Sequence, residues 1–163
     1  MSDLTHVDDS GRARMVDISS KTATERLARA SGSIRMRAET LAAIRDNQIA
    51  KGDVLSVARI AGIMAGKRTS DLVPLCHPIS LTDLQLQFTL DNTLPGVRAE
   101  ATAKTTGKTG VEMEAIMAVS VSLVTIYDMA KGVDKGMEIG QISLNEKRGG
   151  KSGDWVKGSI PAE

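Results

Sequence analysis

TTGKTGVEMEAIMAVSVSLVTIYDMAKGVDK, residues Thr105–Lys135, is the stretch that decides the fold. Thr109 and Glu112 have the spacing of a capping box, which predicts a helix that begins at about Gly110. Gly132 predicts the end of that helix, because glycine readily adopts the backbone conformation that stops one. The charged residues of the stretch gather near its two ends.

Between these ends the predicted helix is apolar on nearly every face. It therefore needs cover on more than one side, and we expect the chain's own sheet and another subunit to provide it. The uncharged run Ala115–Tyr127 includes Ser120, Ser122 and Thr125 and is shorter than the roughly 18 apolar residues that a bilayer requires. We therefore expect no membrane span.

The flanking segments predict an antiparallel sheet. Apolar residues alternate with polar ones over Leu84–Leu90 and again over Val97–Ala103, with a turn at residues 92–96. This pattern predicts a hairpin that leads into the long helix. A further strand is predicted from Glu138 to about Lys147.

The upstream half predicts a strand and two helices. Residues 25–36 favour a strand broken around Ser31 and Gly32, followed by a short helix whose shared face is Ala38, Leu41, Ala42 and Ile44. Asp53 is a natural N-cap for the second helix, whose expected apolar stripe is Val54, Val57, Ala58, Ala61, Met64 and Ala65. The order of elements predicts an α+β fold, a ferredoxin-like split βαβ sandwich with an antiparallel sheet packed by helices.

Length and composition predict a single domain. The 163 residues suit one core, with a polar surface arm at 1–22, in which Met15, Val16 and Ile18 dock, and a mobile Gly-rich tail at 148–163. Lysine and arginine total 21 against 20 acidic residues, so nothing favours nonspecific nucleic-acid or membrane binding. Three aromatic residues, one each of Phe, Tyr and Trp, leave no base-stacking surface. The single cysteine and a start without signal-peptide features predict a cytoplasmic protein.

Two segments resemble the end of a phosphate-binding loop. Gly107-Lys108-Thr109 and Gly150-Lys151-Ser152 both match it, but the first glycine of the full pattern is Thr102 in one case and Asn145 in the other. The segment before the long helix is therefore either an ordinary capping loop or a set of backbone N–H groups that contact an anion.

The loop DLVPLCHP, residues Asp71–Pro78, places Cys76 and His77 between two prolines that fix the backbone. Rigid loops hold catalytic side chains well, although a lone histidine is more often a hydrogen-bonded surface residue and Cys76 a small buried one. With His6 as the only other soft ligand, no metal site is predicted.

Asp128 and Lys131 lie three residues apart and share a face of the predicted helix. They form either a plain ion pair or a site in which a protonated Lys131 donates a proton or binds phosphate. Glu112 and Glu114 are two residues apart and point to different faces, so we do not interpret them as a paired acid and base.

Five long strings then carry a family resemblance: THVDDSGRARMVDIS, KGDVLSVARIAGIMAGKRTSDLVPLCHPI, TGKTGVEMEA, IYDMAKGVDK and GGKSGDW. From about Leu4 to Trp155 the chain resembles the molybdenum cofactor biosynthesis protein C family, the cyclic pyranopterin monophosphate synthases. The resemblance implies a lyase of molybdenum cofactor (molybdopterin) biosynthesis. Such a lyase converts (8S)-3',8-cyclo-7,8-dihydroguanosine 5'-triphosphate, a GTP-derived substrate, to a cyclic pterin monophosphate and releases diphosphate.

The same resemblance implies no redox cofactor and leaves open whether a divalent ion accompanies the triphosphate. It also implies a homohexamer built from dimers, with active sites between subunits. It assigns catalysis to Asp128 and Lys131. The residues matching the family's substrate contacts are Lys51, Leu75, Cys76, His77, Met113 and Glu114, and secondary candidates are Lys67, Arg68, Glu112 and Lys147.

Two further expectations concern how these residues are grouped. We expect Lys51, Lys67, Arg68 and His77 to form one triphosphate-binding cluster. We also expect Lys51 and His77 to come from one subunit and Asp128 and Lys131 from its neighbour. The alternative function is a non-catalytic nucleotide-binding regulatory module, which would bind the ligand without consuming it.

Overall fold

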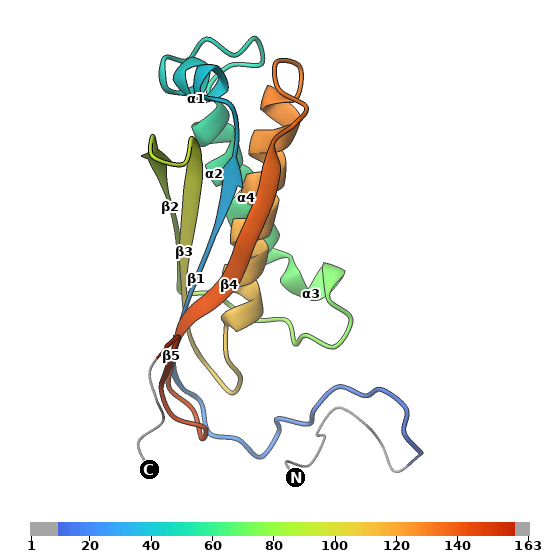
Figure 1. Ribbon diagram of the computed structural model, residues 1–163. Coiled ribbons are helices and arrows are strands. Elements are labelled where there is room, and N and C mark those ends of the chain that lie inside the picture. The colour runs from blue at the N-terminus through green and yellow to red at the C-terminus, as the bar shows by residue number, and fades with distance from the viewer. Residues whose placement is uncertain (1–9, 159–163) are drawn as a thin grey trace.

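The computed structural model describes residues 10–158, which form a five-stranded antiparallel sheet with its long helices against one face (Figure 1). The strand order is β2-β3-β1-β4-β5. The predicted α+β class and antiparallel sheet are confirmed. In chain order the elements are β1 (Thr24–Arg35), α1 (Ala38–Arg45), α2 (Val54–Lys67), α3 (Thr69–Leu72), β2 (Asp83–Asp91), β3 (Gly96–Gly107), α4 (Glu112–Ala130), β4 (Glu138–Arg148) and β5 (Trp155–Val156).

Helix α4 lies across the middle of the sheet and forms the centre of the core (Figure 1). Ala115, Val119, Leu123 and Ile126 are fully buried. By length and composition alone α4 would pass for a membrane span, but half of its most apolar window is buried inside the structure. The expected cover by the chain's own sheet is therefore confirmed.

The start of α4 differs from the prediction. The helix begins at Glu112, its N-cap is Val111, and no side chain caps it, so the Thr109 capping box is wrong. Strand β3 runs on to Gly107, and Val111 is 1% exposed. Burial of Val111 therefore fixes how the chain enters the helix, and Glu112 is left to form an ion pair with Lys147 (Nζ–Oε1 3.7 Å).

Strand β1 is continuous, whereas the sequence predicted a break around Ser31 and Gly32. The irregularities lie instead in its pairing with β4, where the register shifts between Arg29 and Ala30 and again between Ser31 and Ser33. A Cβ added at Gly32 would lie 2.9 Å from side chains of both Val119 and Leu123. The glycine is therefore needed for close packing of α4 and does not interrupt the strand.

The other elements agree largely with the prediction. The hairpin β2–β3 pairs in register from Asp83↔Lys104 to Asp91↔Gly96, and α1 buries Leu41 and Ile44. Asp53 caps α2 by accepting a hydrogen bond from the Ser56 backbone N–H at 3.0 Å. Two short elements, α3 and β5, were not predicted.

The apolar stripe expected on α2 is partly wrong. Val57 and Met64 are 44% and 49% exposed, whereas the core-facing residues are Val54, Ala58, Gly62, Ala65 and Gly66. A Cβ added at Gly62 would lie 2.6 Å from the backbone oxygen of Ala118. The small residues thus bring α2 against α4, and the larger side chains next to them point outward.

This contact predicts the effect of Gly62→Ala. Although alanine favours a helix, overlap with a backbone oxygen forces the two helices apart, so the free energy of unfolding should fall by about 1–3 kcal/mol. Denaturant unfolding measures it. Gly140→Ala is the control, because an added Cβ there meets nothing within 4 Å. Equal stability of the two variants would contradict the packing argument.

Candidate active site

At the C-terminal end of α4, the Asp128 carboxylate lies between two lysine ammonium groups. Lys131 Nζ is 2.7 Å from Oδ1, and Lys51 Nζ is 2.8 Å from Oδ2. Lys51 also donates to the Asp128 backbone oxygen at 2.9 Å. Lys131 reaches Asp128 because it lies one helical turn further on, and Lys51 because the loop before α2 passes this end of α4.

These contacts set the charge states. Hydrogen bonds from Lys131 and Lys51 lower the pKa of Asp128 to about 2. The bond to Asp128 in turn raises the pKa of Lys131. All three side chains are at least half exposed, so the pairs contribute little to stability. At neutral pH the group therefore presents one carboxylate and two ammonium groups to solvent, suited to binding an anion or donating a proton.

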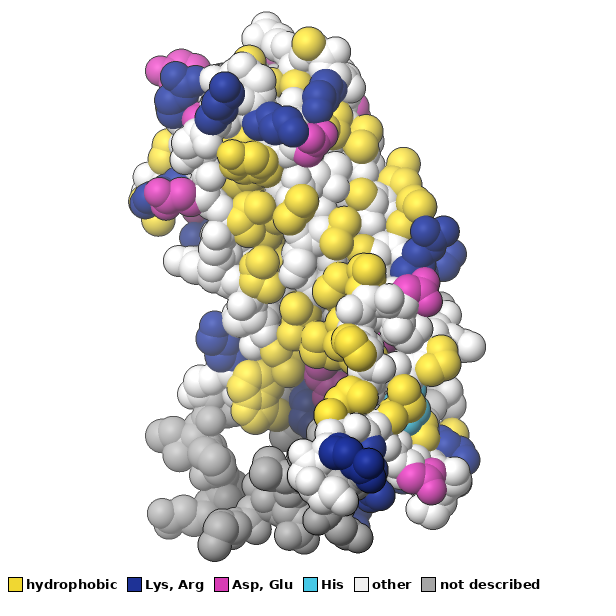
Figure 2. Space-filling model, turned by 90° about the vertical axis from the view of Figure 1, so that its right-hand side faces the viewer, with side chains coloured by type: hydrophobic (Ala, Val, Ile, Leu, Met, Phe, Trp, Pro, Cys, Tyr) yellow, Lys and Arg dark blue, Asp and Glu magenta, His cyan; other side chains and the backbone are white. Residues whose placement is uncertain are grey.

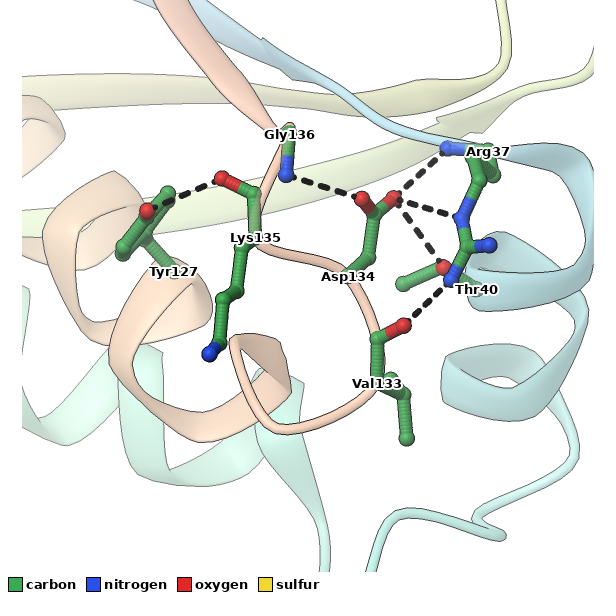
Figure 3. A network of polar contacts seen from close by, with 7 residues as sticks. All are labelled: Arg37, Thr40, Tyr127, Val133, Asp134, Lys135 and Gly136. Carbon is green, nitrogen blue, oxygen red and sulfur yellow. Dashed lines mark hydrogen bonds and ion pairs between the residues drawn. The ribbon is translucent and has the colours of Figure 1, made fainter.

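The loop after Lys131 is anchored by the buried carboxylate of Asp134 (Figure 3). It accepts hydrogen bonds from the backbone N–H groups of Arg37 (2.9 Å) and Gly136 (3.0 Å) and from the Thr40 hydroxyl (3.2 Å). The Arg37 backbone N–H is the first factor that lowers the pKa of Asp134. This network joins the start of α1 to the loop and so fixes the chain that leaves the end of α4.

A cavity of about 290 Å³ lies at the opposite, N-terminal end of α4. The DLVPLCHP loop contributes Leu75, Cys76 and His77 to its lining, and α4 contributes Met113 and Glu114. Val16 and Ile18 of the N-terminal arm also line it, together with Lys21. Val16 and Ile18 are half-buried, whereas Met15, the third residue expected to dock, is 42% exposed.

Glu114 is the buried acid of this cavity. It is 3% exposed, and burial raises its pKa to about 7, with a further contribution from the negative charge of Glu112. Burial and the nearby Glu114 also raise the pKa of the Cys76 thiol. Near neutral pH the Glu114 carboxyl is thus poised to take up or release a proton.

Residues 15–150 match the MoaC family. The chain belongs to this family. It is 61% identical to the cyclic pyranopterin monophosphate synthase of Cereibacter sphaeroides, over 94% of this chain and 96% of the relative. It is 59% identical to the protein of that name from Brucella ovis, over 94% of this chain and 93% of the relative.

In this MoaC chain the residues predicted for the site fall into two separate groups. A helix rises about 1.5 Å per residue, so Glu114 and Asp128 are roughly 21 Å apart along the axis of α4. Lys51 lies with Asp128 and Lys131, whereas His77 lies with Glu114 at the other end. The expected grouping of Lys51 with His77 is therefore wrong.

The secondary candidate residues also lie in different parts of the structure. Lys67 ends α2 and Arg68 follows it, while Lys51 precedes the start of that 14-residue helix, so these cations do not cluster. Glu112 and Lys147 pair at the edge of the Glu114 cavity. His6 lies outside the described residues. Across residues 10–158 no three His, Cys, Asp or Glu side chains gather as a metal site requires.

Sequence reasoning missed Asp134, which lies only three residues beyond Lys131. The sequence around Asp134 gives little indication of its role, because an aspartate in a short loop between lysines is usually solvated. Its partners Arg37 and Thr40 are more than 90 positions away in the chain, so no local pattern reveals them.

The pKa of Glu114 predicts a pH dependence of stability. The folded protein holds this proton up to about pH 7, whereas the unfolded chain loses it near the ordinary value of 4.5. The free energy of unfolding should therefore fall as pH rises from 4.5 through 7, by roughly 2–3 kcal/mol from this group.

Glu114→Gln should remove that slope, so its stability relative to the wild type should increase with pH. Urea unfolding at pH 5, 6, 7 and 8 measures the difference, and Glu39→Gln on the exposed face of α1 is the control. A constant difference between Glu114→Gln and the wild type across this range would contradict the raised pKa.

Proposed function

We propose that this chain is a cyclic pyranopterin monophosphate synthase, a lyase of molybdenum cofactor biosynthesis. It converts (8S)-3',8-cyclo-7,8-dihydroguanosine 5'-triphosphate to cyclic pyranopterin monophosphate and diphosphate. The observation that carries the proposal is the Asp128 carboxylate held between Lys51 and Lys131 in a chain of the MoaC family. Relatives named for this activity match nearly the whole chain.

The reaction requires proton transfers and the departure of a diphosphate, and the two groups suit these needs. The Lys131 ammonium, held protonated by Asp128, donates a proton or stabilises negative charge on the leaving phosphate. Lys51 adds a second positive charge beside it. At the other end, Leu75, Cys76, His77 and Met113 bind the ring system, and Glu114 exchanges a proton near neutral pH.

We propose that each active site joins these groups from two subunits. Within one chain α4 holds them about 21 Å apart, so the C-terminal end of one α4 must meet the N-terminal end of a neighbour's α4. The helical face supports association, since hydrophobic side chains run along its length (Figure 2). Those exposed on α2 and α4 are Val57, Ile60, Met64 and Val124.

The wider proposal is a single cytoplasmic domain with a ferredoxin-like arrangement, assembled as a homohexamer built from dimers. The order β2-β3-β1-β4, with the long helices against one face, supports the ferredoxin-like assignment. A regulatory module that only binds the nucleotide is less well supported, because the matching relatives are named as synthases. Loss of the substrate during incubation, with stoichiometric release of diphosphate, distinguishes the two functions.

The first test replaces the charged residues singly. Asp128→Ala and Lys131→Ala should each reduce turnover at least about 100-fold while the melting temperature stays near that of the wild type, because these side chains are exposed. Lys135→Ala, an exposed lysine of the adjoining loop, should keep normal activity. Near-normal turnover by either alanine variant would refute the catalytic assignment.

The second test mixes inactive variants under conditions of subunit exchange. Lys131→Ala and His77→Ala alter opposite ends of α4, so a mixed pair should contain one site with neither substitution. With equal amounts and random exchange, half of the pairs are mixed and one of the two sites in each is intact, so about a quarter of all sites should recover activity. Lys51→Ala mixed with Lys131→Ala should recover nothing, because both substitutions alter the same end. Demonstrated exchange with no recovery in the first mixture would place the whole site in one subunit.

A further inference from the structure

Asp134 is a buried carboxylate that neither group of the proposed active site uses. It is 5% exposed. Its Oδ2 accepts hydrogen bonds from the Arg37 backbone N–H at 2.9 Å and the Thr40 hydroxyl at 3.2 Å, and its Oδ1 accepts one from the Gly136 backbone N–H at 3.0 Å. A carboxylate is buried at tolerable cost when its oxygens are satisfied in this way. Any role of Asp134 in the reaction is therefore exerted through the chain that it holds.

The chain held by Asp134 is the last turn of α4, where Lys131 is the C-cap. The Lys131 backbone N–H donates to the Tyr127 oxygen at 2.8 Å, and that of Asp134 donates to the Ala130 oxygen at 3.1 Å. Gly132 does not adopt the positive φ with which glycine commonly ends a helix. The turn is instead closed between Ala130 and Asp134, and the Asp134 side chain fastens it to α1.

Arg37 at the start of α1 holds the same turn a second time (Figure 3). Its Nη2 donates to the Val133 backbone oxygen, and its Nε lies 3.6 Å from Oδ2 of Asp134. The Arg37 side chain is 62% exposed, so it lies over the turn from outside. Two successive residues of the loop, Val133 and Asp134, are thus tied to a helix more than 90 positions away in the chain.

The Lys131 ammonium depends on this anchoring more than Lys51 does. Lys51 contacts both a carboxylate oxygen and the backbone oxygen of Asp128, whereas Lys131 reaches Oδ1 of Asp128 at 2.7 Å from a side chain that is 52% exposed. The last turn of a helix frays readily when nothing holds it. The place of the Lys131 ammonium is therefore set by how firmly the backbone is held at the end of α4.

We propose that Asp134 and Arg37 are positioning residues for Lys131, and that by fastening the last turn of α4 to α1 they hold the Lys131 ammonium beside Asp128. The inference rests on the proposed function, in which Lys131 acts on the substrate. It adds two residues that act through Lys131 instead of contacting the substrate. When the turn is loosened, Lys131 should pair less with Asp128, whose hydrogen bond raises the pKa of Lys131. More of the Lys131 amine should then be unprotonated at a given pH.

The test is competitive labelling of the full-length protein with acetic anhydride at pH 8, because unprotonated amines are the ones that react. Mass spectrometry gives the rate at Lys131 relative to Lys67, an exposed lysine at the end of α2. Asp134→Ala should raise this ratio at least about threefold. Global loss of structure would expose both lysines and would not raise the ratio selectively.

Asp134→Asn separates positioning from charge. The amide oxygen can still accept from Arg37 and Thr40, so this variant should label more like the wild type than Asp134→Ala does. An effect of the negative charge alone would make the two variants equal. The control is Asp91→Ala, since the Asp91 carboxylate accepts the backbone N–H groups of Thr93 and Leu94 and shares no partner with Asp134.

A second pair of variants removes exposed side chains and spares the buried carboxylate. Arg37→Ala should raise the labelling ratio at least about twofold, whereas Arg35→Ala should not change it. Arg35 is the matched control, because its side chain is 61% exposed and also pairs with an acidic residue, Glu138, at 2.8 Å. The proposal is overturned if neither Asp134→Ala nor Arg37→Ala raises the ratio, or if Asp134→Asn labels as fast as Asp134→Ala.

Turnover then shows whether the two residues act through Lys131. Asp134→Ala should lower kcat at least about tenfold in the wild type, but should lower the residual turnover of Lys131→Ala less than twofold, because the group that it positions is already gone. Equal losses in both backgrounds would show a general structural role and overturn the proposal. Labelling needs no substrate, so it tests the positioning of Lys131 even if the synthase activity is refuted.

Discussion

Close packing of α4 on a surface of alanines is the interaction on which the rest of the structure depends. The residues of β1 and β3 beneath the helix are fully or almost fully buried and have almost no side-chain height: Ala28, Ala30, Gly32, Ala99, Ala101 and Ala103. Because these side chains are so small, α4 can pack closely on the sheet and bury one of its faces completely. Gly62 lets α2 approach closely enough to cover a second face of α4. The helix is thereby fixed as a rigid rod, and only its two ends carry charged groups.

The two ends of α4 carry groups with different protonation behaviour, and the surroundings of each group determine its charge state. The C-terminal end of a helix favours cations, and Lys131 lies there with its pKa raised by Asp128. The N-terminal end favours carboxylates, which would lower the pKa of Glu114. Burial at 3% exposure overcomes that effect and raises it instead. One helix thus presents a fixed ion cluster at one end and a titrating acid at the other.

Local sequence patterns predicted what depends on local spacing. Alternation identified the β2–β3 hairpin, and Asp53 marked the start of α2, because both signals lie within a few residues. Local patterns gave the wrong answer where packing against distant residues determines the structure. Val111 is buried in the core, so α4 begins after it and the expected cap at Thr109 does not form. Val57 stays exposed because Gly62, on another face of α2, makes the contact with α4. Spacing paired Asp128 with Lys131, but Lys51 meets them only through the fold, 77 residues away.

The same limit explains why the family-matched residues could be named from the sequence although their grouping could not. A sequence motif shows which residues match the family. Which of those residues lie close together depends on which ends of α2 and α4 lie side by side. Since α4 is a rigid rod, no loop movement within the chain brings Asp128 to Glu114. In an isologous pair with its twofold axis near the middle of α4, each C-terminal end meets the partner's N-terminal end, in two identical places. The apolar middle of the helix, which stabilises the single chain, would then also set the distance between the two sites.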